Sequence, residues 1–357
     1  LVIAFSLNAQ QQLIHHDLNV SIEPSTSLIT VEDKISFPRE SFDKELTFKL
    51  NQALTVTSSS ENVEIHLVAN TEKANDMGMD RDDAGDKESS LVINKYKVVF
   101  KENIKTDVFN FSLKYSGKIE SPIVQSEENY QRGFSESPGI ISEKGIYLAG
   151  STYWVPYFDD RMLSFVLGTN LPEGWTTVSQ GGRTQNESIN GSHFDKWKEM
   201  TPQEEVFLIA AKFKEYQFNA GNVLAMAFLR TEDEALANKY LETTAQYLEM
   251  YRQLVGPYPY SKFALVENFW ETGYGMPSFT LLGEKIIRFP FILHSSYPHE
   301  LLHNWWGNSV YIDFDSGNWC EGLTAYMADH LIKEQRGQGA AYRRTTLQKF
   351  GDYVTPE

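Results

Sequence analysis

Cysteine is almost absent from this sequence. Cys320 is the single cysteine among 357 residues, so no intrachain disulfide can form. This composition fits a cytosolic protein and equally a bacterial exported protein that folds without disulfides. Long apolar runs are also missing: no stretch of about 18 consecutive apolar residues occurs, and the sequence therefore predicts no transmembrane span.

Positive charge is scarce. There are 32 Lys and Arg residues against 48 Asp and Glu, which gives a formal charge of −16 at pH 7. An acidic chain repels phosphate backbones, so we expect no nucleic-acid partner. Hydrophobic residues make up 41% of the chain, enough for a large core, which argues against a disordered protein. The length exceeds what one core usually serves, so two domains are expected.

The first twelve residues, LVIAFSLNAQQQ, do not begin with methionine, and we expect the sequence to start inside a longer chain. The apolar run from Leu1 to Leu7, with glutamines after Ala9, is similar to the end of a signal-peptide apolar region and its cleavage site. An ordinary first strand is the alternative. We expect residues 1–12 to be a signal-peptide remnant and the protein to be exported, either periplasmic or extracellular.

Residues 13–217 have the pattern of a β domain. Apolar and polar residues alternate in segments such as FNFSLKY (109–115) and KYKVVF (95–100), which is typical of strands with one buried face. Clusters of Gly, Ser, Asn and Pro separate these segments. We therefore expect a β-sandwich-like N-terminal domain over 13–217.

The pattern changes to helical in residues 218–357. Tyr240, Tyr247 and Tyr251 belong to an apolar series at helical spacing that Gly256 and Pro257 end, and we expect these aromatics in the core. Strands are predicted at 262–268 and 278–283. The whole chain is therefore predicted to be an α+β protein.

The segment HELLHNWWGN (299–308) carries the strongest chemical signal. On a helix, residues four apart differ by about 40° in direction and about 6 Å in height, so His299 and His303 can direct their rings at one point. Glu300 lies about 100° around the helix, beside that point. This is the H-E-x-x-H arrangement of zinc metallopeptidases, with two metal ligands and a neighbouring base. Two buried core histidines are the alternative interpretation.

A third ligand must come from elsewhere. The metzincin pattern needs glycine and histidine where this sequence has Trp306 and Ser309, so that pattern is excluded. Glu321 opens a following predicted helix and completes a His–His–Glu set with an open fourth position, a catalytic zinc geometry. Cys320 is a rival, since thiolate also binds zinc, and adjacent helix residues point about 100° apart. The buried face of that helix is predicted to be Leu323, Tyr326, Met327, Leu331 and Ile332.

These residues resemble the aminopeptidase N family of gluzincin zinc metallopeptidases. HELLHNWWGN resembles the family's zinc-binding helix, and WCEGLTAY (319–326) resembles the start of the helix with the zinc glutamate. YWVPYFDD (153–160) is similar to a stretch of the family's β domain. The resemblance implies a β-rich N-terminal domain followed by a thermolysin-like zinc metallopeptidase domain over 218–357, incomplete at its C-terminus.

The sequence departs from the family in three places. Seventeen residues separate His303 from Glu321, one fewer than usual. The family's G-x-M-E-N motif reads YGMPS, with Pro277 in place of the glutamate that binds the substrate's α-amine. The family's catalytic tyrosine is expected beyond Glu357, because Tyr342 and Tyr353 come too early.

The resemblance implies a zinc-dependent peptidase, an aminopeptidase, with one Zn²⁺ per chain and peptide substrates. Glu300 would be the general base, and Gly275 and Met276 would lie on a backbone strip that binds extended peptide. Since Pro277 cannot bind an amine, either Glu271 or Glu267 replaces the family's glutamate, or the enzyme accepts N-blocked peptides. A zinc endopeptidase, a non-peptide hydrolase and a non-catalytic zinc scaffold are the alternatives. The sequence carries no signal for an oligomeric state.

Overall fold

The computed structural model describes residues 13–39, 46–73, 91–101, 106–125, 135–159, 161–313, 317 and 319–354. The predicted signal-peptide remnant, 1–12, lies outside the described residues. The chain divides into two compact units, the first within 1–122, 138–179 and 183–210, and the second within 123–137, 180–182 and 211–357. No helix in the described ranges is long and apolar enough to cross a membrane.

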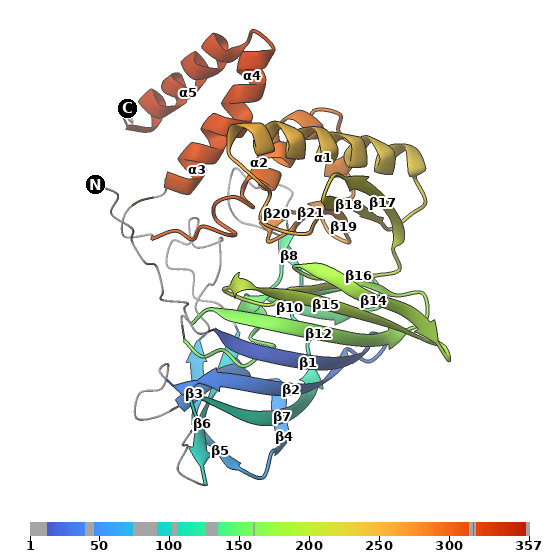
Figure 1. Cartoon of the computed structure of the whole chain (residues 1–357), viewed down its shortest axis with the longest axis vertical. Coiled ribbons are helices and arrows are strands. Elements are labelled where there is room, and N and C mark those ends of the chain that lie inside the picture. Colours follow the sequence, from blue (N-terminus) through green and yellow to red (C-terminus); the bar gives the residue numbers. More distant parts are fainter. Residues whose placement is uncertain are drawn as a thin grey trace, which may run out of the picture. The chain divides into compact units, whose positions relative to one another are not determined.

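The first unit is built on strands with one buried face. Its largest sheet has the order β14-β15-β12-β1-β2-β7-β4 (Figure 1), and β1 pairs in parallel with β12 but antiparallel with β2. The strands of this sheet are β1 (Ile14–Glu23), β2 (Leu28–Pro38), β4 (Leu54–Ser59), β7 (Val108–Lys118), β12 (Leu163–Pro172), β14 (Gly182–Ile189) and β15 (Ser192–Gln203). In β1 buried residues alternate with exposed ones, as the sequence pattern predicts.

Smaller sheets complete the first unit. One has the order β3-β6-β5 and another the order β10-β11-β16-β13. Their bounds are β3 (Leu46–Asn51), β5 (Val63–Lys73), β6 (Val92–Phe100), β10 (Gly139–Ser142), β11 (Gly145–Leu148), β13 (Thr176–Val178) and β16 (Leu208–Ala211), with the short helix η4 (Gly150–Thr152). The strands predicted at FNFSLKY and KYKVVF are confirmed as parts of β7 and β6.

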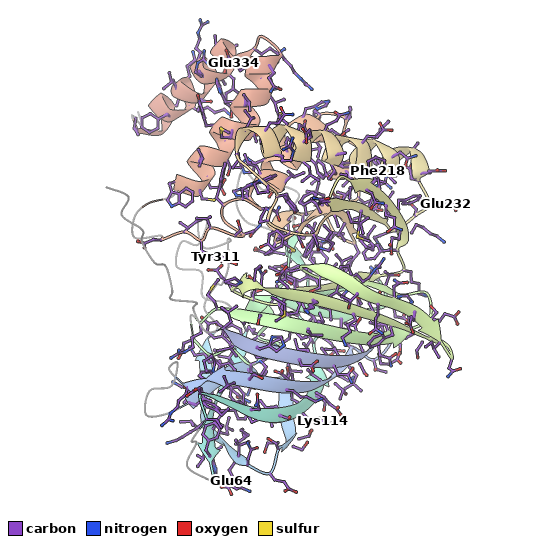
Figure 2. All side chains as sticks on the ribbon, viewed as in Figure 1. Glu64, Lys114, Phe218, Glu232, Tyr311 and Glu334 are labelled. Atoms are coloured by element: carbon purple, nitrogen blue, oxygen red, sulfur yellow. The ribbon has the colours of Figure 1, made fainter. Side chains whose placement is uncertain are left out.

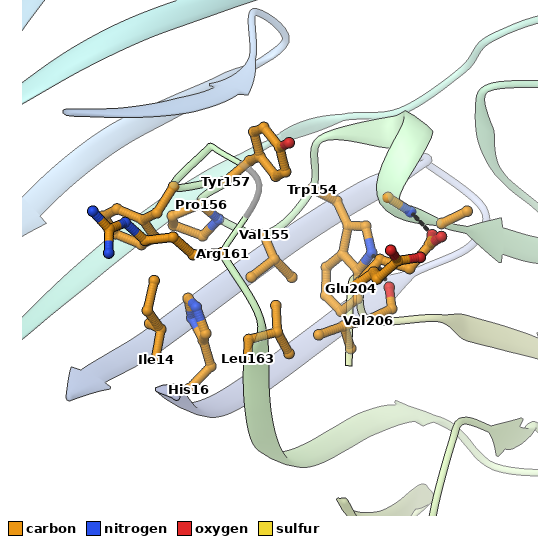
Figure 3. Close-up of a pocket in the computed structure, with 14 residues that line it drawn as sticks. Ile14, His16, Trp154, Val155, Pro156, Tyr157, Arg161, Leu163, Glu204 and Val206 are labelled. Atoms are coloured by element: carbon orange, nitrogen blue, oxygen red, sulfur yellow. Dashed lines mark hydrogen bonds between the residues drawn. The ribbon is translucent and has the colours of Figure 1, made fainter. Parts of the chain in front are cut away.

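A small cavity of ≈ 30 Å³ lies in the first unit beside His16 (Figure 3). This volume holds about two water molecules. His16 is fully buried, its Nδ1 lies 2.8 Å from Oδ2 of Asp33, and its Nε2 has no partner among the described residues. Water in this cavity would satisfy that nitrogen. Ile14 and Leu163 also line the cavity, so its wall is partly apolar.

The second unit contains a five-stranded sheet and helices. The sheet has the order β17-β18-β19-β21-β20, and β19 is parallel to both of its neighbours. Its strands are β17 (Lys214–Ala220), β18 (Val223–Leu229), β19 (Lys262–Asn268), β20 (Gly273–Met276) and β21 (Phe279–Gly283), and β8 (Val124–Gln125) pairs with β9 (Ser135–Glu136). The strand predicted at 262–268 is confirmed with those bounds, and β21 confirms the second.

Helix α1 lies between β18 and β19 along the chain, and the other helices of this unit follow the sheet. Their bounds are α1 (Glu234–Leu254), η5 (Ile286–Arg288), η6 (Ile292–His294), α2 (Ser296–Leu302), α3 (Trp319–Thr324), the π-helical segment η8 (Ala325–His330), α4 (Leu331–Gln335) and α5 (Gly339–Val354). The chain is thus β-rich with a helical C-terminal part, and the predicted α+β class is confirmed.

Helix α1 packs its buried face into the core of the second unit, together with residues of β18, β19 and α2. Its N-cap is Asp233, whose Oδ1 accepts a hydrogen bond from the backbone N–H of Leu236. The predicted core tyrosines, Tyr240, Tyr247 and Tyr251, are buried. Each hydroxyl donates a hydrogen bond to a backbone carbonyl that follows β21 in the chain. These bonds tie the segments on either side of α2 to one rigid helix.

Charged side chains lie on the outside of each unit. Glu64 and Lys114 are exposed in the first unit, and Glu232 and Glu334 in the second (Figure 2). Charged side chains of this kind are seldom buried, because solvation stabilises them.

Candidate metal centre

His299 and His303 face the same point from one helix. α2 ends at Leu302, but its C-cap His303 keeps helical dihedrals, φ −54° and ψ −16°, so the i, i+4 relation of the two histidines holds. Their ring centroids lie 4.8 Å apart. Tyr297 anchors the helix, since it is fully buried and bonds to Thr244 of α1. The pair is therefore set on a helix that the core holds in place.

Glu321 lies between the two rings. Its Oε2 is 3.2 Å from Nε2 of His299, and its Oε1 is 3.2 Å from Nε2 of His303. Tetrahedral zinc with ligand bonds of about 2.0–2.1 Å would place its ligand atoms about 3.3 Å apart. The two 3.2 Å distances, one from each carboxylate oxygen, are close to this spacing, and one ligand atom from each of the three residues lies within 4.8 Å of the others.

Cys320 lies on the other side of His303. Its Sγ is 3.5 Å from Nδ1 of His303, whereas Glu321 meets Nε2. The sulfur is fully buried and does not share the space that both Nε2 atoms face. Of the two candidate third ligands that the sequence left open, the structure brings Glu321 and not Cys320 to the histidine pair.

The remaining ring nitrogens have partners of their own. Nδ1 of His299 lies 3.1 Å from Oδ2 of Asp329, and Nδ1 of His303 lies 3.5 Å from the Thr324 hydroxyl. That hydroxyl donates to the Cys320 carbonyl, so its oxygen is left to accept from the His303 ring. With a metal bound, both histidines would keep a proton on Nδ1 and present the Nε2 lone pair, the tautomer that a metal needs.

Asp329 is a residue that the sequence patterns did not single out. It lies eight positions after Glu321, and in an α-helix of 3.6 residues per turn the two side chains would be about 80° apart. Asp329 lies in the π-helical segment η8, which has about 4.4 residues per turn, so that one α turn and one π turn span eight residues. The π turn therefore brings Asp329 onto the same face as Glu321.

Part of the predicted buried face is wrong, because Leu323 and Tyr326 are 37% and 61% exposed. Leu323 precedes the π turn, and α3 buries Cys320 and Thr324 instead. Tyr326 lies within the π turn, where α-helical spacing does not apply. The buried residues of this stretch are Cys320, Thr324, Ala328, His330 and Ile332.

Glu300 lies beside the three donors and against strand β20. A Cβ atom added to Gly275 would overlap Oε2 of Glu300, so the glycine lets this carboxylate lie directly against the strand. Burial raises the pKa of Glu300, against the lowering effect of His299 and His303. A carboxylate with a raised pKa is a better proton acceptor than an exposed one.

Strand β20 is the last strand of its sheet and pairs only with β21 among the described residues. The backbone N–H of Gly283 bonds to the carbonyl of Thr272, and pairs alternate along an antiparallel ladder. The backbone N–H and C=O of Met276 therefore face Phe279 of β21, and the Met276 side chain is buried. The backbone N–H and C=O of Gly275 point the other way, to the open edge of the sheet. Of the two predicted peptide-binding residues, Gly275 lies at the edge beside Glu300 and Met276 does not.

The charges of the cluster stabilise one another. Burial lowers the pKa of His299, but hydrogen bonds to Asp329 and Glu321 outweigh it and raise the pKa to about 10. Burial raises the pKa of Glu321, and its bonds to both histidines outweigh this and hold it well below the usual range. The centre is thus a pocket of negative charge that favours a cation, and the Glu321 side chain is 43% exposed, which leaves an opening to solvent.

The donor set fits zinc. Two imidazole nitrogens and one carboxylate are a known catalytic zinc set, with the fourth position left for water or substrate. Among the described residues His299, His303 and Glu321 form such a group of potential metal ligands. This chain can therefore hold a metal ion at these three side chains.

Comparison with known proteins finds the fold but no close relative. No protein-family model and no curated protein matches the chain. An M1 zinc metallopeptidase from Deinococcus radiodurans aligns over 95% of this chain and 74% of its own, with a TM-score of 0.67 and 14% identity. A mutant of the enzyme from that organism, bound to a Tyr-Ser-Ala substrate, aligns over 95% and 75%, with a TM-score of 0.66 and 13% identity.

Native yeast LTA4 hydrolase aligns over 95% of this chain and 51% of its own, with a TM-score of 0.65 and 13% identity. At such low identities the likeness concerns the fold. The chain has the fold of the M1 zinc metallopeptidases, with a β-rich N-terminal part and a helical C-terminal part, as the sequence predicts.

Proposed function

We propose that the protein is a zinc-dependent peptidase. The observation that carries the proposal is the contact of three groups in one place: the His299–His303–Glu321 set, the Glu300 carboxylate and the open edge at Gly275. A metal site alone would need no base beside it. The fold of M1 zinc metallopeptidases supports the same conclusion.

Metal binding, proton transfer and peptide binding fall to different residues. His299, His303 and Glu321 hold the zinc ion, which when bound polarises a carbonyl and makes water more acidic. Glu300 accepts a proton from the attacking water and passes it to the leaving amine. The edge of β20 adds an extended peptide as a further strand, held by the outward N–H and C=O of Gly275. Glu300 and the peptide backbone are thereby brought side by side.

We propose more specifically that the peptidase is an aminopeptidase, which needs a residue that binds the free α-amine of the substrate. Glu267 is already engaged, because its Oε1 forms a 2.8 Å ion pair with Arg288 and its Oε2 accepts from the backbone N–H of Arg230. Its carboxylate is buried in that pair. Both oxygens of Glu267 therefore already have partners, and its burial keeps it away from a substrate amine.

Glu271 is directed away from Glu300. Its Oε1 accepts from the backbone N–H of Lys285, and its Oε2 lies where a Cβ of Gly283 would be. Gly283 is three residues along β21 from the partner of Gly275, which corresponds to about 10 Å and to the opposite face of the sheet. These contacts support a second candidate, a zinc peptidase that accepts N-blocked peptides.

Peptide hydrolysis by the full protein tests the proposal. The wild type should hydrolyse peptides, and Glu300→Gln, which keeps size but cannot accept a proton, should lose at least about a hundredfold in kcat at equal zinc content. If the zinc-loaded wild type hydrolysed no peptide of a library, the proposal would be refuted. A screen of ester and epoxide substrates would then test the non-peptide alternative. If Glu300→Gln were as active as the wild type, Glu300 would not be the general base.

Hydrolysis rates of one peptide with a free and with an acetylated N-terminus distinguish an aminopeptidase from a peptidase that accepts N-blocked peptides. A preference above about a hundredfold for the free amine supports aminopeptidase action. Loss of that preference in Glu271→Gln would identify the anchor. Near-equal rates support the second candidate. We also propose that the protein is exported, on the pattern of residues 1–12, which detection of the protein outside the cytoplasm would test.

A further inference from the structure

We infer that Asn304 is a positioning residue that holds the β20–β21 hairpin at a set distance from Glu300. Its side chain is fully buried, and its two polar atoms bond in opposite directions. Oδ1 accepts from the backbone N–H of Ser278 at 2.6 Å, in the turn of the hairpin. Nδ2 donates to the carbonyls of Glu300 at 3.3 Å and Leu301 at 3.1 Å, in α2.

The hairpin end of this bridge is a strained turn. Met276 pairs with Phe279, so Pro277 and Ser278 form a two-residue turn, and Ser278 has a φ of 69°. A residue other than glycine seldom adopts this conformation, and it persists where surrounding contacts impose it. The turn therefore needs support from outside the hairpin.

Three donors and acceptors supply that support. Besides the bond that Ser278 donates to Asn304, the ammonium group of the buried Lys262 lies 2.7 Å from Oγ and 3.2 Å from the carbonyl of Ser278. The backbone N–H of Gly181 donates to the same Oγ at 3.1 Å. Lys262 and Gly181 hold Ser278 from the sheet side, and Asn304 alone among these contacts joins it to α2.

The bridge spans the part of the site where substrate and base meet. Ser278 is three residues from Gly275, whose backbone lies against the Glu300 carboxylate, and Asn304 is one helical turn after Glu300. One side chain thus connects the strand that would bind peptide with the helix that carries the base. A displacement of about 1 Å in such an arrangement can cost about a hundredfold in rate. The effect of this distance on catalysis rests on the proposed function, whereas the hydrogen-bonded bridge does not.

The test uses the full protein and three variants. Asn304→Ala removes both ends of the bridge, and Asn304→Asp keeps the acceptor for Ser278 but loses the donor to α2. Asn219→Ala, at an exposed asparagine of β17, is the matched control. The readouts are zinc content, amide hydrogen exchange over residues 273–283, and kcat and KM on one peptide.

We expect Asn304→Ala to retain zinc within about twofold, because His299, His303 and Glu321 are untouched. Exchange over 273–283 should accelerate at least about tenfold, while α1 remains unchanged. KM should rise about tenfold or more, and by a larger factor than kcat falls. Asn304→Asp should keep slow exchange in the turn and give an intermediate KM, and Asn219→Ala should resemble the wild type.

Wild-type exchange and KM in Asn304→Ala would overturn the inference. Faster exchange in every element of the unit together with loss of zinc would also overturn it, since Asn304 would then serve the fold in general. A wild type without peptidase activity would refute the proposed function, whereas local acceleration of exchange in Asn304→Ala would still establish the bridge.

Discussion

The carboxylate of Asp329 lies 3.1 Å from Nδ1 of His299, on the side of the ring opposite to Glu321. One imidazole is thus held between two carboxylates, of which one would share the metal with it and the other orients it. A hydrogen bond at Nδ1 sets the ring's tautomer and direction and increases the basicity of Nε2. The candidate metal centre therefore includes one residue beyond the three potential ligands.

Asp329→Ala should weaken zinc binding. Loss of a carboxylate behind a histidine ligand typically costs about 10- to 100-fold in metal affinity or activity. Asp329→Asn, which keeps an acceptor oxygen, should lose less, and Asp352→Ala, at an exposed aspartate of α5, should lose nothing. Competition with a chelator of known affinity measures the dissociation constant. Wild-type affinity in Asp329→Ala would mean that the His299 ring needs no support.

The ligand set predicts a specific order of zinc loss. His299→Ala and His303→Ala should abolish binding of one zinc per chain, and Glu321→Ala should weaken it, because each removes a donor from the cluster. Cys320→Ser should keep near-normal zinc, because its Sγ faces Nδ1 of His303. Metal analysis of the purified variants decides the matter. Full loss in the cysteine variant with retention in the glutamate variant would reverse the assignment.

Gly275→Ala should reduce activity without loss of zinc. The added Cβ would overlap Oε2 of Glu300, so either the base or the strand must move. We expect a decrease of about tenfold to a hundredfold in kcat/KM. Gly351→Ala in α5, where a Cβ meets no atom within 4 Å, is the control. Full activity in Gly275→Ala would show that the strand and the base are not in contact during the reaction.

The second unit should lose stability in alkali, in part through Tyr247. Burial raises the pKa of Tyr247 to about 12, whereas an unfolded tyrosine ionises near pH 10. The folded pKa is the higher one, so this contribution is fully present below pH 10 and is lost as the pH rises toward about 12.

Tyr247→Phe isolates that contribution. At pH 8 the variant should be less stable by about 1 kcal/mol, because the bond to the Leu293 carbonyl is lost. Between pH 10 and 12 the difference from the wild type should shrink, since phenylalanine does not ionise. Urea unfolding at pH 8 and pH 11 measures it, and a constant difference would contradict the assignment of the raised pKa to this side chain.

Local periodicity accounts for much of the site. The i, i+4 spacing of His299 and His303 places two rings on one side of any helix, and Glu300 next to the first ring follows from the same geometry. Glu321 was predicted from its place in the first turn of the following helix. Alternation and helical spacing likewise predicted β6, β7, β19 and α1, because such patterns depend on residues close in the chain.

Tertiary structure decided what depends on contacts between distant segments. Asp329 reaches His299 because a π turn changes the helical register, and no spacing rule for an α-helix predicts that shift. The choice between Glu321 and Cys320 depended on which nitrogen of His303 each one meets. By itself, the sequence determined that two histidines share one helix face with a glutamate next to the first of them, since that follows from bond geometry within a few residues. Only the folded chain decided what surrounds them, because Asp329, Gly275 and Asn304 act through space across elements that the sequence separates.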